Sequence, residues 1–131
     1  MKKIFILFIS VIAFVACTDQ PKVDEAYMTL LESQVAATEK QLPVEIVTGQ
    51  LSYFHVELDK SSATLTHCYC FNRTPTVTEE TKRNAKANAI ALLKANPTER
   101  MPLEKGITMQ YKYYSRNRNL LYSVTITPDD L

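Results

Sequence analysis

Four runs of alternating apolar and polar residues constrain the fold of this chain more than any other feature of its sequence. They occupy residues 51–58, 63–71, 107–113 and 120–126. Because successive side chains of a strand point to opposite faces, each run predicts a strand with one apolar and one polar face. Short polar segments, residues 59–62 and 115–119, join the runs in pairs, so each pair predicts a β-hairpin.

A helix is expected ahead of each hairpin. Over residues 23–42, apolar residues recur at spacings of three and four, which is typical of an amphipathic helix, and the pattern stops at a proline. Residues 78–96 have a helix-forming composition and a face of small alanines that allows close packing on a sheet. Thr76 or Thr78 would cap the start of this second helix, and Pro97 would end it.

The order helix, hairpin, helix, hairpin predicts an α+β domain built from two αββ units. Antiparallel strands with one apolar face need that face covered, and the two helices offer the apolar surfaces to cover it. We therefore expect a four-stranded antiparallel sheet with both helices packed on one face. Residues 44–50 and 97–106 are expected to be irregular connections. The single domain would span residues 25–131.

The first sixteen residues have the pattern of an export signal rather than of a folded element. Lys2 and Lys3 precede an apolar stretch from residue 4 to residue 16 that only Ser10 interrupts. Such a stretch is too short for a permanent membrane-spanning helix, which needs about 20 apolar residues. Residues 1–16 are therefore predicted to be a signal peptide.

The residues that end this stretch, Phe14-Val15-Ala16-Cys17, resemble the lipobox of bacterial lipoproteins. The resemblance implies cleavage before Cys17 and attachment of acyl chains to it, which anchor a protein stably when two or three are present. Residues 17–24 then form a lipidated tether. Thr18 is compatible with sorting to the outer membrane, so we expect a lipid-anchored envelope protein that faces the periplasm. The alternative is an ordinary secretory signal that leaves a free cysteine.

Charge and motifs argue against nucleic-acid binding and catalysis. The chain has 15 basic and 14 acidic residues, and loss of Lys2 and Lys3 with the signal leaves a nearly neutral domain, unlike a dedicated nucleic-acid binder. It has no Gly-rich phosphate loop, no G-x-S-x-G nucleophile motif and no H-E-x-x-H helix. We therefore predict a protein that is not an enzyme and needs no cofactor.

The stretch HCYCF, residues 67–71, holds two cysteines of the predicted domain. On a strand, Cys68 and Cys70 point to one face and His67 to the other, so a metal site would lack ligands and none is predicted. The two thiols could form a strained, reducible disulfide, or act as small, half-buried apolar residues. Both alternatives stay open at this point.

The polar face of the predicted sheet is expected to be open to solvent or to a partner. Alternation assigns to it Tyr53, His55, Thr64, Thr66, Cys68, Cys70, Gln110, Lys112, Tyr114, Ser123 and Thr125. In the second hairpin turn, guanidinium groups could pair with carboxylates or phosphates. The candidate partner-binding residues are Tyr53, His55, Tyr114, Arg116 and Arg118. The simpler interpretation is an ordinary solvated face and a charged turn.

The end of the chain, ITMQYKYYSRNRNLLYSVTITPDDL, is similar to small uncharacterised bacterial envelope lipoproteins that end in a hairpin of the type YxYxDxxGxxLxSxxITPxDL. This chain departs from that pattern at the turn, where Arg116-Asn117-Arg118 replaces an Asp-and-Gly type. The resemblance implies an envelope location and carries over no activity.

These observations predict a lipid-anchored, non-catalytic protein of the bacterial envelope that binds or assembles other proteins through its open sheet face or hairpin tips. One alternative is an inhibitor or immunity protein that blocks an enzyme by inserting a hairpin, with Tyr114 and Arg116 as anchors. A second is an envelope thiol-redox protein or enzyme that uses Cys68 and Cys70. The expected partners are the membrane, through the lipid, and a protein of unknown identity.

Overall fold

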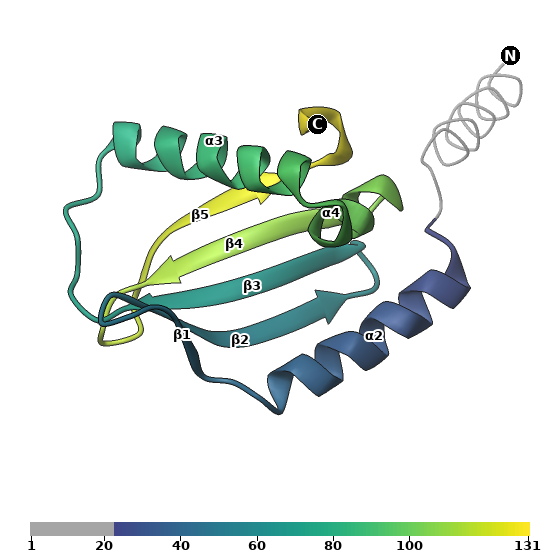
Figure 1. The fold of residues 1–131 in the computed structure, drawn as a ribbon, viewed down its shortest axis with the longest axis horizontal. Coiled ribbons are helices and arrows are strands. Elements are labelled where there is room, and N and C mark those ends of the chain that lie inside the picture. The colour runs from purple at the N-terminus through teal and green to yellow at the C-terminus, as the bar shows by residue number, and fades with distance from the viewer. Residues whose placement is uncertain (1–22) are drawn as a thin grey trace, which may run out of the picture.

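The computed structural model describes residues 23–131 (Figure 1). The predicted signal peptide 1–16, the lipidation site Cys17 and most of the tether 17–24 lie outside these residues. Within the described range, no helix combines the length and the apolar character that a membrane span needs.

The described chain runs through a helix, three strands, two helices, two strands and a last turn of 3-10 helix. The helices are α2 (Glu25–Glu39), α3 (Glu79–Ala95), α4 (Pro97–Glu104) and the 3-10 helix η1 (Pro128–Asp130). The strands are β1 (Val44–Val47), β2 (Leu51–Asp59), β3 (Thr64–Phe71), β4 (Thr108–Tyr114) and β5 (Leu120–Ile126). Both predicted helices and all four predicted strands are present, and β1 and α4 are additional.

The strands form one mixed sheet in the order β1-β2-β3-β4-β5. Neighbours are antiparallel except β3 and β4, which run parallel from the pair Thr64 and Thr108 to the pair Cys70 and Tyr114. The prediction of a four-stranded antiparallel sheet is therefore wrong. The reason is the path of α3, which at about 1.5 Å per residue is as long as β3 and returns the chain to the end of the sheet where β3 began.

β1 and α4 stand where irregular connections were expected. β1 has four residues, too few for alternation to be distinctive, and pairing of Val44 with Tyr53 and of Glu45 with Ser52 holds it to β2. α4 begins at Pro97, the residue expected to end the preceding helix, because proline is well tolerated in the first turn of a helix. Both elements therefore depend on their neighbours in the chain and in the sheet rather than on their own pattern.

Local capping signals place the helix starts. The Thr78 hydroxyl accepts from the Thr81 amide at 3.1 Å, and the Thr81 hydroxyl accepts from the Thr78 amide at 3.2 Å, so Thr78 rather than Thr76 caps α3. The carboxylate of Asp24 accepts from the Ala26 amide at 3.1 Å and caps α2. Each cap satisfies an amide that has no partner inside its helix.

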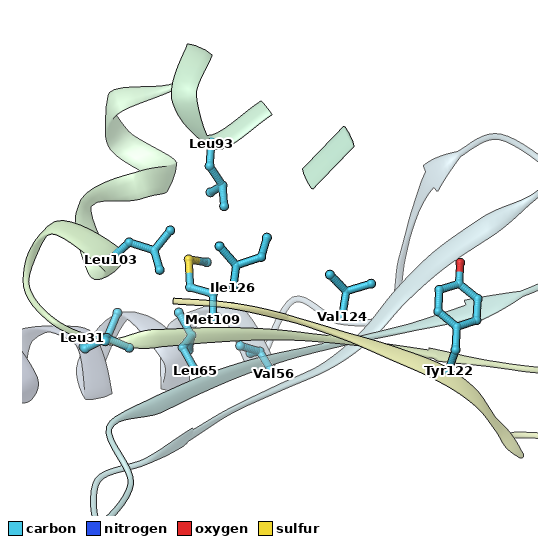
Figure 2. Packing of buried hydrophobic residues seen from close by; sticks show 10 residues of the cluster. Leu31, Val56, Leu65, Leu93, Leu103, Met109, Tyr122, Val124 and Ile126 are labelled. Carbon is cyan, nitrogen blue, oxygen red and sulfur yellow. The ribbon is translucent and has the colours of Figure 1, made fainter. Parts of the chain in front are cut away.

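The core lies between the helices and one face of the sheet. α3 packs on β5 and α4 on β4, whereas α2 lies along β2 (Figure 1). Figure 2 shows Leu93 of α3 above Met109 and Ile126 of the sheet and Leu103 of α4 beside them, and Leu31 of α2 belongs to the same cluster. This packing leaves the opposite face of the sheet to the polar half of the strand pattern.

A β-bulge in β2 changes which side chains face the core. The register of β2 against β3 shifts between Tyr53 and His55. Tyr53 therefore lies on the helix side, in contact with His67, and Phe54 lies beside Tyr114 on the opposite side. Alternation had assigned Tyr53 to the open face and Phe54 to the core. Both assignments are wrong, because one extra residue in a strand reverses its alternation.

Candidate functional site

An open groove of about 650 Å³ crosses the helix side of the sheet. It exists because α3 sits toward β5 and α2 sits along β2, so the middle strands are not fully covered between them (Figure 1). We call this feature the helix-side groove. Its lining comprises Ile46, Leu51, Tyr69, Tyr111 and Tyr113 of the sheet, Ala85, Asn88, Ala89, Leu92, Leu93 and Ala95 of α3, and Asn96 and Glu99 at the start of α4.

Stacked tyrosines form the floor of the groove. The ring centroid of Tyr69 lies 6.2 Å from that of Tyr111 and 5.4 Å from that of Tyr113, with nearly parallel planes. Burial raises the pKa of Tyr69 and of Tyr111, and it raises the pKa of Tyr113 to about 12. These phenols are therefore neutral at physiological pH, and the floor combines apolar rings with uncharged hydroxyl groups.

The walls of the groove combine exposed apolar side chains with the polar side chains of Asn88, Asn96 and Glu99. Leu92 of α3 is 71% exposed and Ile46 of β1 is 50% exposed. Ala85 and Ala89 keep the α3 wall low, so a partner could approach the tyrosine floor closely. Exposed apolar side chains around an open groove are typical of a protein interaction site.

His67 lies beside the groove floor and carries an unpaired ring nitrogen. Its Nδ1 is 2.7 Å from the Tyr53 hydroxyl, and its ring stacks on Tyr111 at a centroid distance of 5.3 Å. Nε2 is buried without a hydrogen-bond partner. Burial lowers the pKa of His67 to about 4, so the imidazole is neutral at physiological pH. The residue therefore acts as an aromatic part of the core.

His55, a predicted partner-binding residue, joins β2 to α2. Its Nδ1 lies 2.7 Å from Glu39 Oε1, and the other Glu39 oxygen accepts from the Val56 amide at 2.9 Å. The Glu39 hydrogen bond raises the pKa of His55, and the Val56 amide and then His55 lower the pKa of Glu39. Glu57 lies 3.6 Å from Nε2 on the other side of the ring. The arrangement binds a helix end to a strand edge.

Tyr114 and Arg118 meet around Phe54, away from the groove. The guanidinium carbon of Arg118 lies 3.9 Å from the centroid of the Phe54 ring, and the Tyr114 ring makes an edge contact with Phe54 at 5.4 Å. Arg116 is exposed at the tip of the same hairpin. Of the five predicted partner-binding residues, the structure thus brings Tyr114 and Arg118 together, and it places Tyr53 and His55 elsewhere.

Cys68 and Cys70 are buried free thiols. The Cys70 sulfur donates to the Ser115 carbonyl at 3.2 Å, which connects β3 to the turn after β4. Burial raises the pKa of the Cys68 thiol, which makes it a poor nucleophile at neutral pH. Within residues 23–131, no three His, Cys, Asp or Glu side chains are grouped so that they could hold a metal ion.

The helix-side groove was not predicted from the sequence. Alternation places Tyr69, Tyr111 and Tyr113 on the apolar side of the strands, which the helices were expected to cover, whereas the helices leave part of this surface open. No strand was expected at Ile46, so no groove wall was expected there. The signals available in the sequence were the number of tyrosines on the apolar side of the strands and the run of apolar residues around Leu92 and Leu93. Neither signal separates a groove floor from a closed core without the helix positions.

No protein-family model matches this chain, and no curated protein matches it. Three solved structures resemble it in fold. The type 2 secretion system pilotin EpsS from Vibrio vulnificus is 14% identical, with a TM-score of 0.59 over 78% of this chain and 88% of EpsS. The type II secretion system pilotin AspS from Vibrio cholerae is 17% identical, with a TM-score of 0.59 over 79% of this chain and 90% of AspS.

The third structure is a candidate secreted protein from Pseudomonas aeruginosa, which is 12% identical with a TM-score of 0.63 over 78% of this chain and 89% of that protein. At these identities the likeness shows a shared fold.

Proposed function

We propose that this protein is a lipid-anchored, non-catalytic assembly factor that works as a pilotin in a bacterial secretion system. The observation that carries the proposal is the helix-side groove, with exposed Leu92 and Ile46 above a tyrosine floor. Two pilotins share its fold, and the lipobox at Cys17 supports an envelope location. The groove is the surface through which the protein binds a subunit of the secretion machine.

The shape and chemistry of the groove favour a helical segment as its occupant. One wall is the helix α3 with its low alanine face, and the floor consists of flat aromatic rings. An amphipathic helix presents apolar side chains at spacings of three and four residues, which would lie between Leu92 and Ile46 and rest on the tyrosines. The tyrosine hydroxyls, Asn88 and Asn96 supply neutral hydrogen-bonding groups for the polar flank of that helix.

The lipid anchor would keep the groove at the membrane surface. The tether of residues 17–24 has eight residues, and an extended chain spans at most about 3.5 Å per residue, so the domain stays within roughly 28 Å of the acylated Cys17. A partner captured in the groove would then be held at the same membrane. This is the step that an assembly factor for an outer-membrane machine has to perform.

Site-specific photocrosslinking in the native membrane tests the proposal. A photoreactive amino acid at Leu92 should capture a subunit of the secretion channel, and Leu92→Asp should weaken that complex by about tenfold or more, because a carboxylate would be buried against an apolar helix. The same variant should reduce the assembled channel in outer-membrane fractions. Because Leu92 is exposed, the substitution should leave thermal stability nearly unchanged.

Leu30 of α2 is the matched control, since it is a leucine that is 53% exposed and does not line the groove. A photoreactive residue at Leu30 should capture no channel subunit, and Leu30→Asp should leave channel assembly unchanged. Equal capture from both positions, or normal channel assembly in the Leu92→Asp variant, would show that the groove is not the binding surface for the channel subunit. Capture of an enzyme from a photoreactive residue at Arg116 would instead support the inhibitor alternative.

A further inference from the structure

β5 is a free edge of the sheet. It is the last strand in the order and pairs only with β4. Half of the backbone amide and carbonyl groups of an edge strand point away from its neighbour, and such a row of groups is a template for another strand. The sequence of β5, LLYSVTI, contains no proline and no charged residue that would prevent this pairing.

Other edge positions of this sheet are shorter or already occupied. β1, at the opposite edge, has four residues. Where β1 no longer covers β2, the carboxylate of Glu39 accepts from the Val56 amide, and α2 lies alongside. Within residues 23–131, no backbone or side-chain group outside β4 bonds to an amide of β5. β5 is therefore the longest edge that is ready to pair.

A row of basic side chains borders this edge. Lys82, Arg83 and Lys86 of α3 line a shallow hollow of about 330 Å³ together with Ser123, Val124 and Thr125 of β5. The acidic groups near this row are Glu79, 3.2 Å from the Lys82 amine, and Asp130, 3.7 Å from the Lys86 amine. The Glu79–Lys82 pair is exposed and the Asp130–Lys86 pair is partly exposed, so water screens both pairs and they hold the lysines weakly.

We propose that β5 binds an extended, acidic segment of a partner protein as a sixth strand of the sheet. Backbone hydrogen bonds to β5 supply the affinity, and acidic side chains at every second position of the segment meet Lys82, Arg83 and Lys86. This surface is separate from the helix-side groove and goes beyond the proposed function. A partner that carries both an amphipathic helix and an acidic extended segment could engage the two surfaces together.

A second copy of this chain is a poorer occupant of the edge than an acidic segment. Two β5 strands pairing about a two-fold axis would bring two rows with Lys82, Arg83 and Lys86 side by side. Repulsion between the rows opposes this pairing. The same charges therefore protect the edge against self-association and select an acidic partner.

The test uses a fluorescent nine-residue peptide in which Glu alternates with Val and Thr. Fluorescence anisotropy measures its binding to the folded domain, and NMR measures hydrogen exchange of the backbone amides. The proposal expects binding that weakens when salt is raised from about 0.05 to 0.5 M, since screening lengths shorten with salt. It also expects slower exchange of β5 amides when the peptide is bound.

Charge reversal on α3 is the first variant. Lys82→Glu with Arg83→Glu should weaken the peptide by about tenfold or more, and acidic residues in this early part of α3 suit the helix dipole, so the domain should stay folded. Lys40→Glu with Lys94→Glu makes the same change in net charge on exposed positions away from β5 and should alter the affinity by less than about twofold. Equal losses of peptide affinity in the two double variants would show that only the net charge of the domain matters, and this would overturn the proposal.

Two further arms separate strand pairing from other binding modes. Two versions of the same acidic peptide carry N-methyl groups, one on the odd-numbered amides and the other on the even-numbered amides. The version whose methyl groups replace the amide hydrogens that point at β5 should fail to bind, because it cannot donate hydrogen bonds to that strand. Undiminished binding of both methylated peptides, or protection of amides elsewhere than β5, would contradict the proposal.

Leu92→Asp, which alters the groove, should leave the peptide affinity unchanged. A large loss of affinity in this variant would place the peptide in the groove instead. Dimerisation of the domain through β5 would also overturn the assignment to an acidic partner.

Discussion

Arg118 occupies a backbone position that suits glycine. Its φ is 67°, in the left-handed region, where a side chain costs about 1–2 kcal/mol. In the lipoprotein hairpin pattern that this chain resembles, the turn carries a glycine at the corresponding place. Arg118 offsets part of the cost by placing its guanidinium group over Phe54. The turn therefore keeps the glycine geometry with a basic residue in it.

Arg118→Gly is expected to stabilise the protein slightly. Relief of the left-handed conformation should exceed the loss of an exposed cation–π contact, which is worth about 0.5–1 kcal/mol, so the free energy of unfolding should rise by about 0.5 kcal/mol. Urea denaturation measures this change. Arg116→Gly, in the same turn and without a positive φ, should instead be neutral or destabilising. A loss of stability in Arg118→Gly would show that the Phe54 contact outweighs the backbone strain.

His67 should make the protein less stable in mild acid. Its pKa is about 4 in the fold against an ordinary value of 6.5. Between these pH values the unfolded chain holds a proton on this imidazole that the folded chain does not, so stability falls as the pH falls from 6.5 to 4, by roughly 3 kcal/mol. Above pH 6.5 the residue contributes no pH dependence. Chemical denaturation at a series of pH values measures the loss.

The matched variant for this prediction is His67→Phe, which keeps a ring on Tyr111 and cannot take up a proton. Its stability should fall by less than that of the wild type between pH 6.5 and pH 4, because only carboxylates and His55 still titrate. His55→Phe should retain the steep fall. If His67→Phe and the wild type have parallel stability profiles, His67 is not the group responsible.

At the scale of elements, the contact of Glu39 with β2 explains how α2 stays on the sheet edge. Glu39 stands at the end of α2 and satisfies the Val56 amide, which β1 does not reach. Because the pKa of His55 is raised in the fold, its bond to Glu39 contributes most to stability below pH 6.5. This contribution to stability is lost as the pH rises through the pKa that His55 has in the folded protein. Because the pKa of Glu39 is lowered in the fold, its ionised carboxylate contributes fully to stability above pH 4.5. This contribution to stability is lost as the pH falls through the pKa that Glu39 has in the folded protein. The contact is therefore strongest between about pH 4.5 and 6.5.

Glu39→Ala should loosen this attachment. Hydrogen exchange of the Val56 amide should become faster, and the pKa of His55 should return toward 6.5 in an NMR titration, because both lose their partner. Overall stability should fall by at most about 1 kcal/mol, since both side chains are about 40% exposed. Glu57→Ala should lower the His55 pKa less and leave Val56 exchange unchanged. An unaltered His55 pKa in Glu39→Ala would contradict the contact.

The elements also show which parts of the fold the sequence could predict. The two hairpins and the two helices were predicted because alternation, helical spacing and the capping threonine act within a few residues. β1 and α4 were not predicted. A strand of four residues is too short for alternation to be recognised, and Pro97 stands both at the end of one helix and at the start of the next. The bulge beside Phe54 was not predicted either, since the adjacent rings of Tyr53 and Phe54 suit either face and no glycine or proline marks the bulge.

At the scale of the whole molecule, the predicted membrane attachment rests on Cys17, which lies outside the described residues. Cys17→Ser should abolish incorporation of labelled palmitate and move the protein from the membrane to the soluble fraction, because the acyl chains provide the anchor. Cys68→Ser is the control, since it also removes one thiol but lies within β3, and it should keep the label and the membrane location. Unchanged fractionation of Cys17→Ser would mean that another feature attaches the protein.

Short stretches of the chain were enough to predict the class of each strong element and the polar and apolar sides of most strands, because each of these is encoded locally. The signals for export and lipid attachment are also local patterns, and they stay predictions. The parallel pairing of β3 with β4, the transfer of Tyr53 to the helix side, and the opening of the groove above Tyr69 and Tyr111 became visible only in the folded arrangement. These features depend on where α2 and α3 settle on the sheet. That position is set by packing between segments distant in the chain, which no local pattern records.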